Sequence, residues 1–194
     1  VQKKAPSFHV FPIVNRSSVG LIKKSGKQVE AAAERLRAMN PDVEVEEHET
    51  FLNEQNALEL IKSYDFVVEG TDNFASKYLV NDACVMLGKG FTIGGINRFH
   101  GQVMTHLPGT ACYRCIFPEP PAVAEVETCS MVGVLGPLAG MIGTVQATET
   151  IKAVAGMGST LTDALPVVFG ERPAHVVVGH VSNALCGLVP TYIL

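Results

Sequence analysis

A short apolar run, Asp65-Phe-Val-Val-Glu69, leads directly into Gly70-Thr-Asp-Asn73 and then into a helical pattern over Phe74–Leu87. Such runs are typical of strands that are buried on both faces of a parallel sheet. A second run of this kind, Phe91–Ile96, follows the helix. The order strand, helix, strand predicts two neighbouring central parallel strands joined by a crossover helix, which limits the chain to an α/β fold.

The rest of the chain continues this alternation. Apolar residues at helical spacing predict further helices at Lys27–Met39, from Asn53 to about Ser63, and from Pro137 to before Gly156. Short runs predict strands at Val43–Glu47, Gln102–Leu107, Leu165–Phe169 and His175–Val181, with one more inside Phe8–Val14. The other residues up to Ser25 are expected to form loop. The inner face of the Phe74–Leu87 helix is predicted to carry Ala75, Leu79, Ala83 and Met86. Together these elements predict a doubly wound, mainly parallel sheet.

Composition excludes several classes of protein. The 194 residues suit one domain of roughly 150 residues with an appendage. The 15 basic and 19 acidic residues give a net charge of −4, which argues against a nucleic-acid partner, since such a partner needs a basic surface. Five cysteines make no disulfide framework, so we expect a reducing, cytoplasmic location. The uncharged run Met131–Val145 is shorter than the ~20 residues of a membrane span, so we expect a buried helix of a soluble core and no membrane association.

The segment Gly70–Asn73 is the first candidate site. In open parallel sheets, ligands bind beyond the carboxyl ends of the strands, where this segment is predicted to lie. Gly70 would let a ligand approach the backbone, Asp72 could hold a divalent cation, and the N-terminus of the next helix favours phosphate oxygens. The alternative is that Thr71 or Asp72 only caps that helix.

The cysteines are candidates for metal or sulfur chemistry. Cys112 and Cys115 form a CxxC, a spacing at which two thiolates can bind one zinc ion. We expect them to lie close together without completing a four-ligand site. The remaining candidate ligands are Cys84, Cys129, Cys186, His175 and His180. Cys129 ends a proline-rich loop, Ile116–Ser130, that we expect to be poorly ordered. An exposed thiol there could act as a nucleophile, and the alternative is a spectator cysteine.

Other polar residues could line the same cleft. Lys27 stands at a helix N-terminus, where it opposes the helix dipole unless it faces an anion. Arg98, a candidate catalytic residue, and Gln102 flank Gly101 in a turn after a strand. The sequence contains neither the GxxxxGK[ST] of a P-loop nor a GxGxxG, so these nucleotide-binding glycine loops are absent from it.

Five strings of the sequence together carry a family resemblance. They are VEAAAERLRAMNPDVEVE, FVVEGTDNFASKYLVNDACVMLGK, RFHGQV, CYRCIFPEPP and TCSMVGVLGPLAGMIGTVQATETIK. Through them, the stretch from Val29 to about Gly156 resembles the ThiF/MoeB/HesA family, the prokaryotic relatives of the ubiquitin-activating enzymes. The combination of TDN, GQV, CYRC and the cysteine before GVLGP is far more specific than any single string.

The resemblance implies a Rossmann-like fold and an adenylyltransferase. Members of the family use ATP and Mg²⁺ to adenylate the C-terminal glycine of a ubiquitin-like sulfur-carrier protein of the ThiS or MoaD type. The match implies that Asp72 helps to hold Mg²⁺ and phosphate within the nucleotide-binding loop of Gly70, Thr71, Asp72 and Asn73. It implies that Cys129 handles sulfur, and that Cys112 and Cys115 are half of a structural zinc site. The implied partners are the carrier, a sulfurtransferase or cysteine desulfurase, and a second copy in a homodimer.

The sequence also departs from the family pattern. Residues 1–25 lack the strand, GxGGxG loop and helix with which members begin, so we expect a sheet that is incomplete at its N-terminal side. The family's nucleotide-binding lysine falls on Gln28, beside Lys27, and of a second CxxC only Cys186 remains. We therefore expect a divergent N-terminal segment (1–25), a ThiF-type core (26–160) and a divergent tail (161–194). The alternative function is a truncated or degenerate, non-catalytic relative that binds the carrier or dimerises.

Overall fold

The computed structural model describes residues 11–14, 18–22, 26–122, 133–168 and 175–177. Within them, strands form a sheet in the order β3-β2-β1-β4-β5-β6-β7-β8. The strands are β1 (Phe11–Val14), β2 (Ser18–Ile22), β3 (Glu44–His48), β4 (Phe66–Glu69), β5 (Gly90–Asn97), β6 (His100–His106), β7 (Ala164–Val168) and β8 (His175–Val177). The helices are α1 (Gly26–Met39), α2 (Ala57–Lys62), α3 (Phe74–Leu87), α4 (Tyr113–Ile116) and α6 (Gly136–Ala155).

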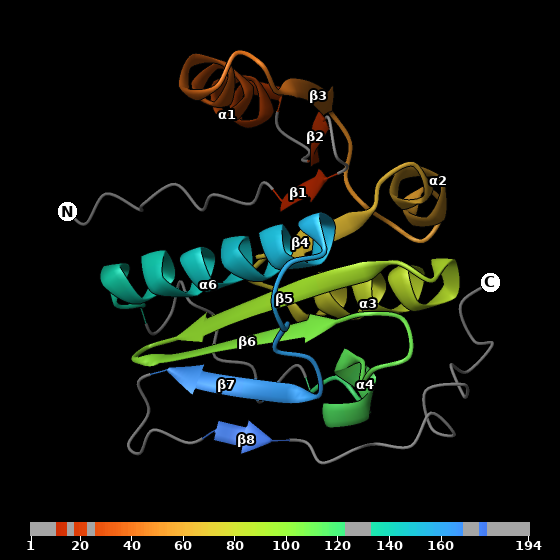
Figure 1. The fold of residues 1–194 in the computed structure, drawn as a ribbon, viewed down its shortest axis with the longest axis vertical. Coiled ribbons are helices and arrows are strands. Elements are labelled where there is room, and N and C mark those ends of the chain that lie inside the picture. Colours follow the sequence, from red (N-terminus) through yellow and green to blue (C-terminus); the bar gives the residue numbers. More distant parts are fainter. Residues whose placement is uncertain (1–10, 15–17, 23–25, 123–132, 169–174, 178–194) are drawn as a thin grey trace.

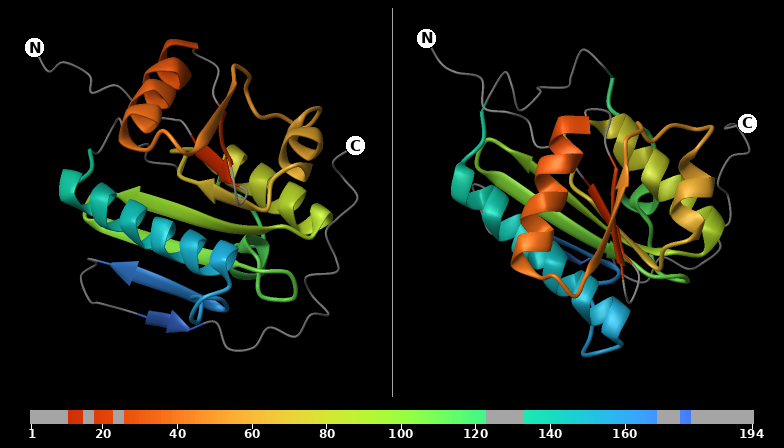
Figure 2. Two further views of the ribbon diagram at one scale, coloured as in Figure 1. Left: turned by 45° about the horizontal axis from the view of Figure 1, so that its top comes forward. Right: turned by 90° about the horizontal axis from the view of Figure 1, so that it is seen from above.

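Helices cover both faces of the sheet. Figure 1 shows the strands between the helices, and Figure 2 shows α1 and α6 on one face with α2, α3 and α4 on the other. The largest apolar cluster lies between the sheet and α2, α3 and α4, and includes Ile61, Tyr64, Phe91 and Tyr113. A smaller cluster of Val103, Leu138 and Ile142 lies under α6. This two-sided arrangement confirms the predicted α/β class and doubly wound layering.

The central strand pair is the one that the sequence predicts. β4 and β5 pair in parallel, from Phe66 opposite Gly90 to Glu69 opposite Ile93, and α3 connects them. Their place in the middle of the strand order confirms the predicted central pair. α3 has the predicted bounds and ends at Gly88, whose φ of 62° is the left-handed conformation that glycine adopts at helix ends.

The sheet as a whole is mixed, which corrects the expectation that it is mainly parallel. Of the seven described strand pairings only two, β2–β3 and β4–β5, are parallel. Parallel neighbours need a long crossover connection, whereas a short turn produces an antiparallel pair. β5 and β6, for example, are joined by a turn of two residues, Arg98 and Phe99, with Asn97 opposite His100. That hairpin agrees with the predicted strand after Phe91–Ile96.

The N-terminal segment contains more structure than its sequence indicates. The single strand expected inside Phe8–Val14 is β1, but Ser18–Ile22 also forms a strand, where loop was expected. This second strand, β2, pairs in parallel with β3. Its five residues include Gly20, and glycine weakens a strand pattern, so the run carries little local signal.

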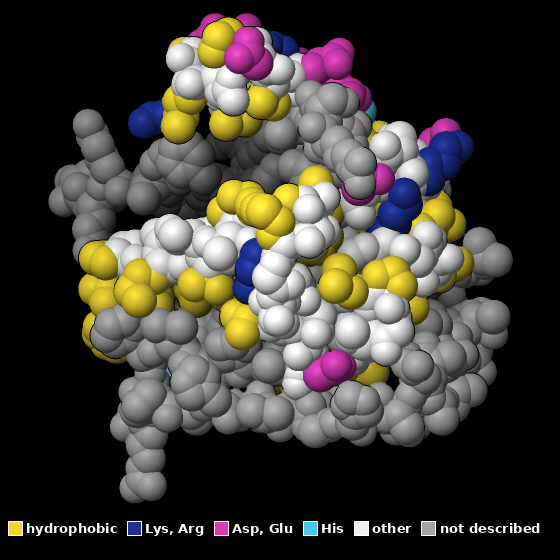
Figure 3. Space-filling model, viewed as in Figure 1, with side chains coloured by type: hydrophobic (Ala, Val, Ile, Leu, Met, Phe, Trp, Pro, Cys, Tyr) yellow, Lys and Arg dark blue, Asp and Glu magenta, His cyan; other side chains and the backbone are white. Residues whose placement is uncertain are grey.

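Helix α6, predicted to be a buried helix of the core, is buried along one side only. Leu138 and Ile142 are at most 4% exposed, whereas Met141 and Ile151 are 44% and 59% exposed. Figure 3 shows hydrophobic side chains along the outer side of α6. None of the helices in the described part of the chain has the length and apolarity that crossing a bilayer requires.

Two glycines test the packing between α6 and the sheet. A Cβ at Gly94 of β5 would lie 2.7 Å from Gln146 Cδ and 3.0 Å from Ile142 Cγ2, whereas a Cβ at Gly140 of α6 would meet nothing within 4 Å. We expect Gly94→Ala to lower the free energy of unfolding by ~1–3 kcal/mol through overpacking. We expect Gly140→Ala to raise it by ~0.5–1 kcal/mol through helix propensity. Urea unfolding measures both free energies. Equal changes in the two variants would contradict the close packing of α6 against Gly94.

Candidate functional site

A cavity of about 690 Å³ opens at the carboxyl ends of β4 and β5. This volume lies within the range of about 300–1,000 Å³ typical of small-molecule sites. Its lining comes from the β4–α3 loop, α3, the β5–β6 hairpin, α6 and two single positions. The lining residues are Gly70, Thr71, Asp72, Asn73, Phe74, Lys77, Gly94, Gly95, Ile96, Asn97, His100, Gly101, Gln102, Tyr113, Val134, Ala139, Ile142, Gly143 and Gln146. The loop Gly70–Asn73 therefore lies where the sequence predicts a ligand site.

The loop residues have different roles in the structure. Asn73 is the N-cap of α3, since its Oδ1 accepts a hydrogen bond from the Ser76 N–H at 2.8 Å. This corrects the alternative in which Thr71 or Asp72 is the cap. Asp72 is exposed and lines the cavity. Asp72 thus directly precedes the N-cap of α3, where both a cation and phosphate oxygens would be accommodated.

Thr71 is hydrogen-bonded to the buried carboxylate of Glu69. The Thr71 N–H donates to Glu69 Oε1 at 2.7 Å, and the Thr71 hydroxyl donates to the same oxygen. Glu69 is wholly buried and Thr71 is 9% exposed. In this structure the Thr71 hydroxyl is therefore used to shape the loop, and the loop offers the cavity chiefly the exposed carboxylate of Asp72.

Several site residues escaped the sequence analysis because they are polar residues within apolar patterns. Periodicity placed Ala75 and Met86 on the buried face of α3, but both are exposed, Met86 at 59%. The buried face instead includes Lys77. On α6, Gln146 Nε2 donates to the carbonyl of Glu69 at 2.8 Å. A polar side chain inside an apolar helix was the available signal for Lys77 and Gln146.

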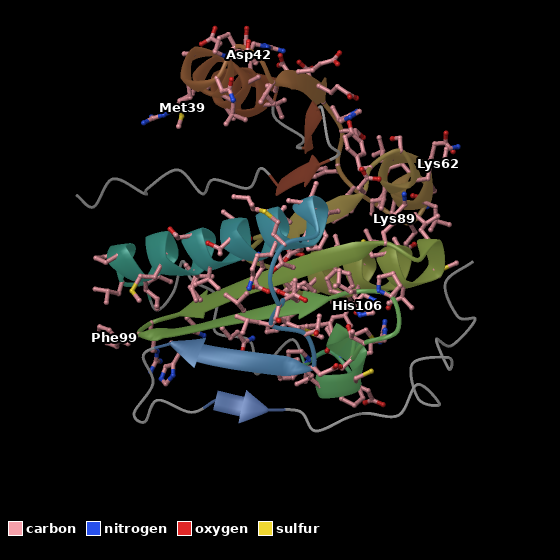
Figure 4. All side chains as sticks on the ribbon, viewed as in Figure 1. Met39, Asp42, Lys62, Lys89, Phe99 and His106 are labelled. Atoms are coloured by element: carbon pink, nitrogen blue, oxygen red, sulfur yellow. The ribbon has the colours of Figure 1, made fainter. Side chains whose placement is uncertain are left out.

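Arg98 lies next to the cavity but is not one of its lining residues. It occupies the tip of the β5–β6 hairpin with a φ of 52°, a left-handed conformation that costs about 1 kcal/mol or more outside glycine. Its N–H donates to the Gly133 carbonyl at 3.2 Å, and its carbonyl accepts from the Leu135 N–H at 3.0 Å. Figure 4 shows the next residue, Phe99, at this tip and His106 at the other end of β6.

Two other predicted site residues lie elsewhere or outside the described residues. Lys27 is the second residue of α1, and no residue of α1 whose side chain the structure describes lines the cavity. Cys129, and with it the loop Ile116–Ser130 beyond residue 122, lies outside the described residues. The roles proposed for Lys27, Arg98 and Cys129 stay predictions.

The CxxC pair has the predicted proximity. Cys112 Sγ and Cys115 Sγ are 3.6 Å apart, close enough to share one metal ion. Among the residues that the structure describes, no group of three or more histidine, cysteine, aspartate or glutamate side chains could hold a metal. Cys186 and His180 lie outside those residues. Cys84 is a poor ligand candidate, because burial raises the pKa of its thiol to about 12 and so opposes the thiolate that zinc requires.

The turn that carries these cysteines is bonded to α3. Arg114 donates from Nε and Nη2 to the two carboxylate oxygens of Asp82, each at 2.7 Å. This bidentate hydrogen bonding raises the pKa of Arg114 above its usual range. The guanidinium also lies over the ring of Tyr78, 4.8 Å from its centroid. The CxxC therefore has a fixed place relative to the helix that begins at the cavity.

Comparison with known proteins places the chain in one family. The sequence model described as the ThiF family matches residues 13–168. The chain belongs to the ThiF family. The family resemblance of the sequence is thereby confirmed, and the Asp72 loop lies inside the matched region.

Named relatives of this ThiF-family chain are about 40% identical to it. The sulfur carrier protein adenylyltransferase of Thermus thermophilus is 44% identical over 136 residues, which cover 67% of this chain and 50% of that protein. The adenylyltransferase and sulfurtransferase MOCS3 of Culex quinquefasciatus is 42% identical over 158 residues, covering 80% and 35%. The SAMP-activating enzyme E1 of Haloferax volcanii is 41% identical over 152 residues, covering 75% and 56%. The chain thus spans about a third to just over half of these relatives.

Solved structures support the fold. The structure of Escherichia coli MccB with ATP superposes with a TM-score of 0.68 at 17% identity, covering 84% of this chain and 52% of that one. The Rossmann-like α/β fold is therefore shown, and this likeness by itself says nothing of chemistry.

The distinction between Asp72 and Asn73 can be tested by stability. We expect Asn73→Ala to lower the free energy of unfolding by ~1 kcal/mol through loss of the helix cap. We expect Asp72→Asn to change it by less than ~0.5 kcal/mol, as is usual for exposed side chains. Thermal unfolding of the two variants beside the wild type measures this. If Asp72→Asn lowered the free energy of unfolding as much as Asn73→Ala, the role of Asp72 would be to stabilise the end of the helix.

Proposed function

We propose that the chain takes part in the ATP-dependent adenylation of the C-terminal glycine of a ubiquitin-like sulfur-carrier protein, preparing it for sulfur transfer. The observation that carries this proposal is the exposed carboxylate of Asp72 in the cavity at the carboxyl ends of β4 and β5. It is supported by membership of the ThiF family and by relatives named as sulfur carrier protein adenylyltransferase and SAMP-activating enzyme.

The reaction makes specific demands on this cavity. An oxygen of the glycine carboxylate attacks the α-phosphorus of ATP, the bond from that phosphorus to the bridging oxygen breaks, and pyrophosphate leaves. Catalysis then depends on alignment of the reactants and on stabilisation of negative charge on the phosphate oxygens. The N-terminus of α3, a helix of 14 residues, brings partial positive charge to the cavity where Asn73 and Phe74 line it.

The residues present fit a magnesium ion. Mg²⁺ is usually bound through one or two carboxylates together with phosphate oxygens and water. Asp72 can supply the carboxylate, since it is exposed and lines the cavity. When bound, Mg²⁺ would neutralise phosphate charge. Thr71 and Asn73 would then act by shaping the loop, and Gly70 by allowing close approach.

Pyrophosphate exchange tests the reaction and the role of Asp72. With ATP, Mg²⁺ and a ThiS- or MoaD-type carrier, we expect carrier-dependent exchange of labelled pyrophosphate into ATP. Asp72→Asn should lower its rate about 100-fold or more, the usual loss when a preorganised electrostatic group is removed. The matched control is Asp65→Asn, an exposed aspartate just before β4 that does not line the cavity, which should retain the wild-type rate.

The same assay separates the two candidate functions. Since the sequence has no glycine-rich phosphate loop, we expect weak binding of ATP by this chain alone, and exchange is best measured at saturating ATP. Absence of exchange, together with absence of nucleotide binding in calorimetry, would refute adenylation. It would leave the alternative of a module that binds the carrier or dimerises.

Cys129 is proposed to act after adenylation, on the evidence of sequence alone. Adenylation involves no thiol, so we expect Cys129→Ala to retain pyrophosphate exchange. Formation of the carrier thiocarboxylate, measured by mass spectrometry with a sulfur donor present, should fall severalfold or more. An unchanged yield of thiocarboxylate would make Cys129 a spectator.

Other parts of the proposal rest on the family resemblance. Cys112 and Cys115 would supply two of the four ligands of a structural zinc ion, and we expect less than one tightly bound zinc per chain. One full equivalent would instead indicate ligands outside the described residues, with Cys186 and His180 as candidates. A homodimer, a sulfurtransferase or cysteine desulfurase as partner, and a cytoplasmic location stay predictions.

A further inference from the structure

An ion pair lies beneath the Gly70–Asn73 loop. Lys77 Nζ is 2.6 Å from Glu69 Oε2, and the two side chains are 8% and 0% exposed. Lysine and glutamate are almost never buried so completely unless they are paired, because each charge loses its hydration. Even when paired, such residues add little stability compared with an apolar pair of similar volume. Stability alone therefore does not account for this pair.

The pair connects the loop to the central strands. Lys77 Nζ also donates to the carbonyl of Gly94 in β5, at 2.6 Å. On its other side, the Glu69 carboxylate accepts the N–H of Thr71 at 2.7 Å together with the Thr71 hydroxyl. The ammonium of Lys77 thus holds the Glu69 carboxylate, which in turn holds Thr71 in the loop. Its bond to Gly94 also connects them to β5.

The hydrogen bonds of Lys77 and Glu69 end at Thr71, the residue before Asp72. Lys77 and Gly94 both line the cavity, and Asp72 follows Thr71 directly. We propose that Lys77 is a positioning residue that acts through Glu69 to hold the Gly70–Asn73 loop in the conformation that presents Asp72 to the cavity. The identity of the ligand that Asp72 would bind rests on the proposed function, whereas the role of Lys77 in the conformation of the loop does not.

Amide hydrogen exchange of the full chain tests the positioning directly. Lys77→Met removes the ammonium. The matched control, Arg114→Met, removes the ion-pair partner of Asp82. The Asp82 side chain is on the same helix as Lys77, is only 5% exposed and does not line the cavity. We expect exchange of the Thr71 amide to be about tenfold faster or more in K77M than in R114M, as loss of a hydrogen bond to a charged group implies. Amides of β6 should exchange alike in both variants.

A second variant guards against simple unfolding. K77M leaves the Glu69 carboxylate buried without its ion-pair partner, which is strongly destabilising. E69Q/K77M removes both charges and keeps a side-chain oxygen near Thr71. We expect this double variant to be folded, with the Thr71 amide still exchanging severalfold faster than in the wild type. Wild-type protection of that amide in the folded double variant would overturn the proposal.

A functional measurement separates this inference from adenylation itself. In pyrophosphate exchange, K77M should need about tenfold more Mg²⁺ for half-maximal rate, as a tenfold weaker site implies, and R114M should not. If the wild type shows no pyrophosphate exchange while the Thr71 amide of K77M still loses protection from hydrogen exchange, adenylation is refuted and the positioning role stands. If K77M and R114M speed hydrogen exchange of the Thr71 amide equally, the positioning role is refuted.

Discussion

The parallel pairing of β4 with β5 decides where the other parts of the site can lie. It brings the carboxyl ends of both strands to one edge of the sheet, with Glu69 opposite Ile93. The helix that returns the chain between them must begin at that same edge. The N-terminus of α3, the exposed carboxylate of Asp72 and the backbone of Gly94 meet there for this reason, before any side-chain contact is considered.

The parts of the fold that follow from local pattern could be predicted from the sequence. Apolar runs gave β4 and β5, and helical spacing gave α1, α3 and α6, because each signal lies within one continuous segment. β2 was not predicted, since its five residues with a central glycine carry little local signal, although it pairs with the preceding β1 as well as with β3. The mixed sheet was missed because the direction of pairing depends on connections and partners outside each segment.

The site was predictable in position but not in the roles of its residues. Thr71, Asp72 and Asn73 are all good cap residues. The structure identifies Asn73 as the cap by its extended backbone, with φ −134° and ψ 144°, and by the hydrogen bond that its Oδ1 accepts from the Ser76 N–H. Lys77 is eight residues from Glu69, and Gln146 is 77 residues from it. Periodicity treats both as interruptions of an apolar face, because it contains no information on distant polar partners.

Gln146 shows why fold and chemistry have to be argued separately in this family. Its side-chain amide bonds the carbonyl of Glu69, and its side chain fills the space that a Cβ at Gly94 would need. A glutamine and a glycine thus set the distance between α6 and the central strands. The sheet that they hold together is shared with structures only 17% identical, such as MccB. A shared sheet therefore shows the fold alone, and the chemistry proposed for this chain depends on the few residues of the β4–α3 loop.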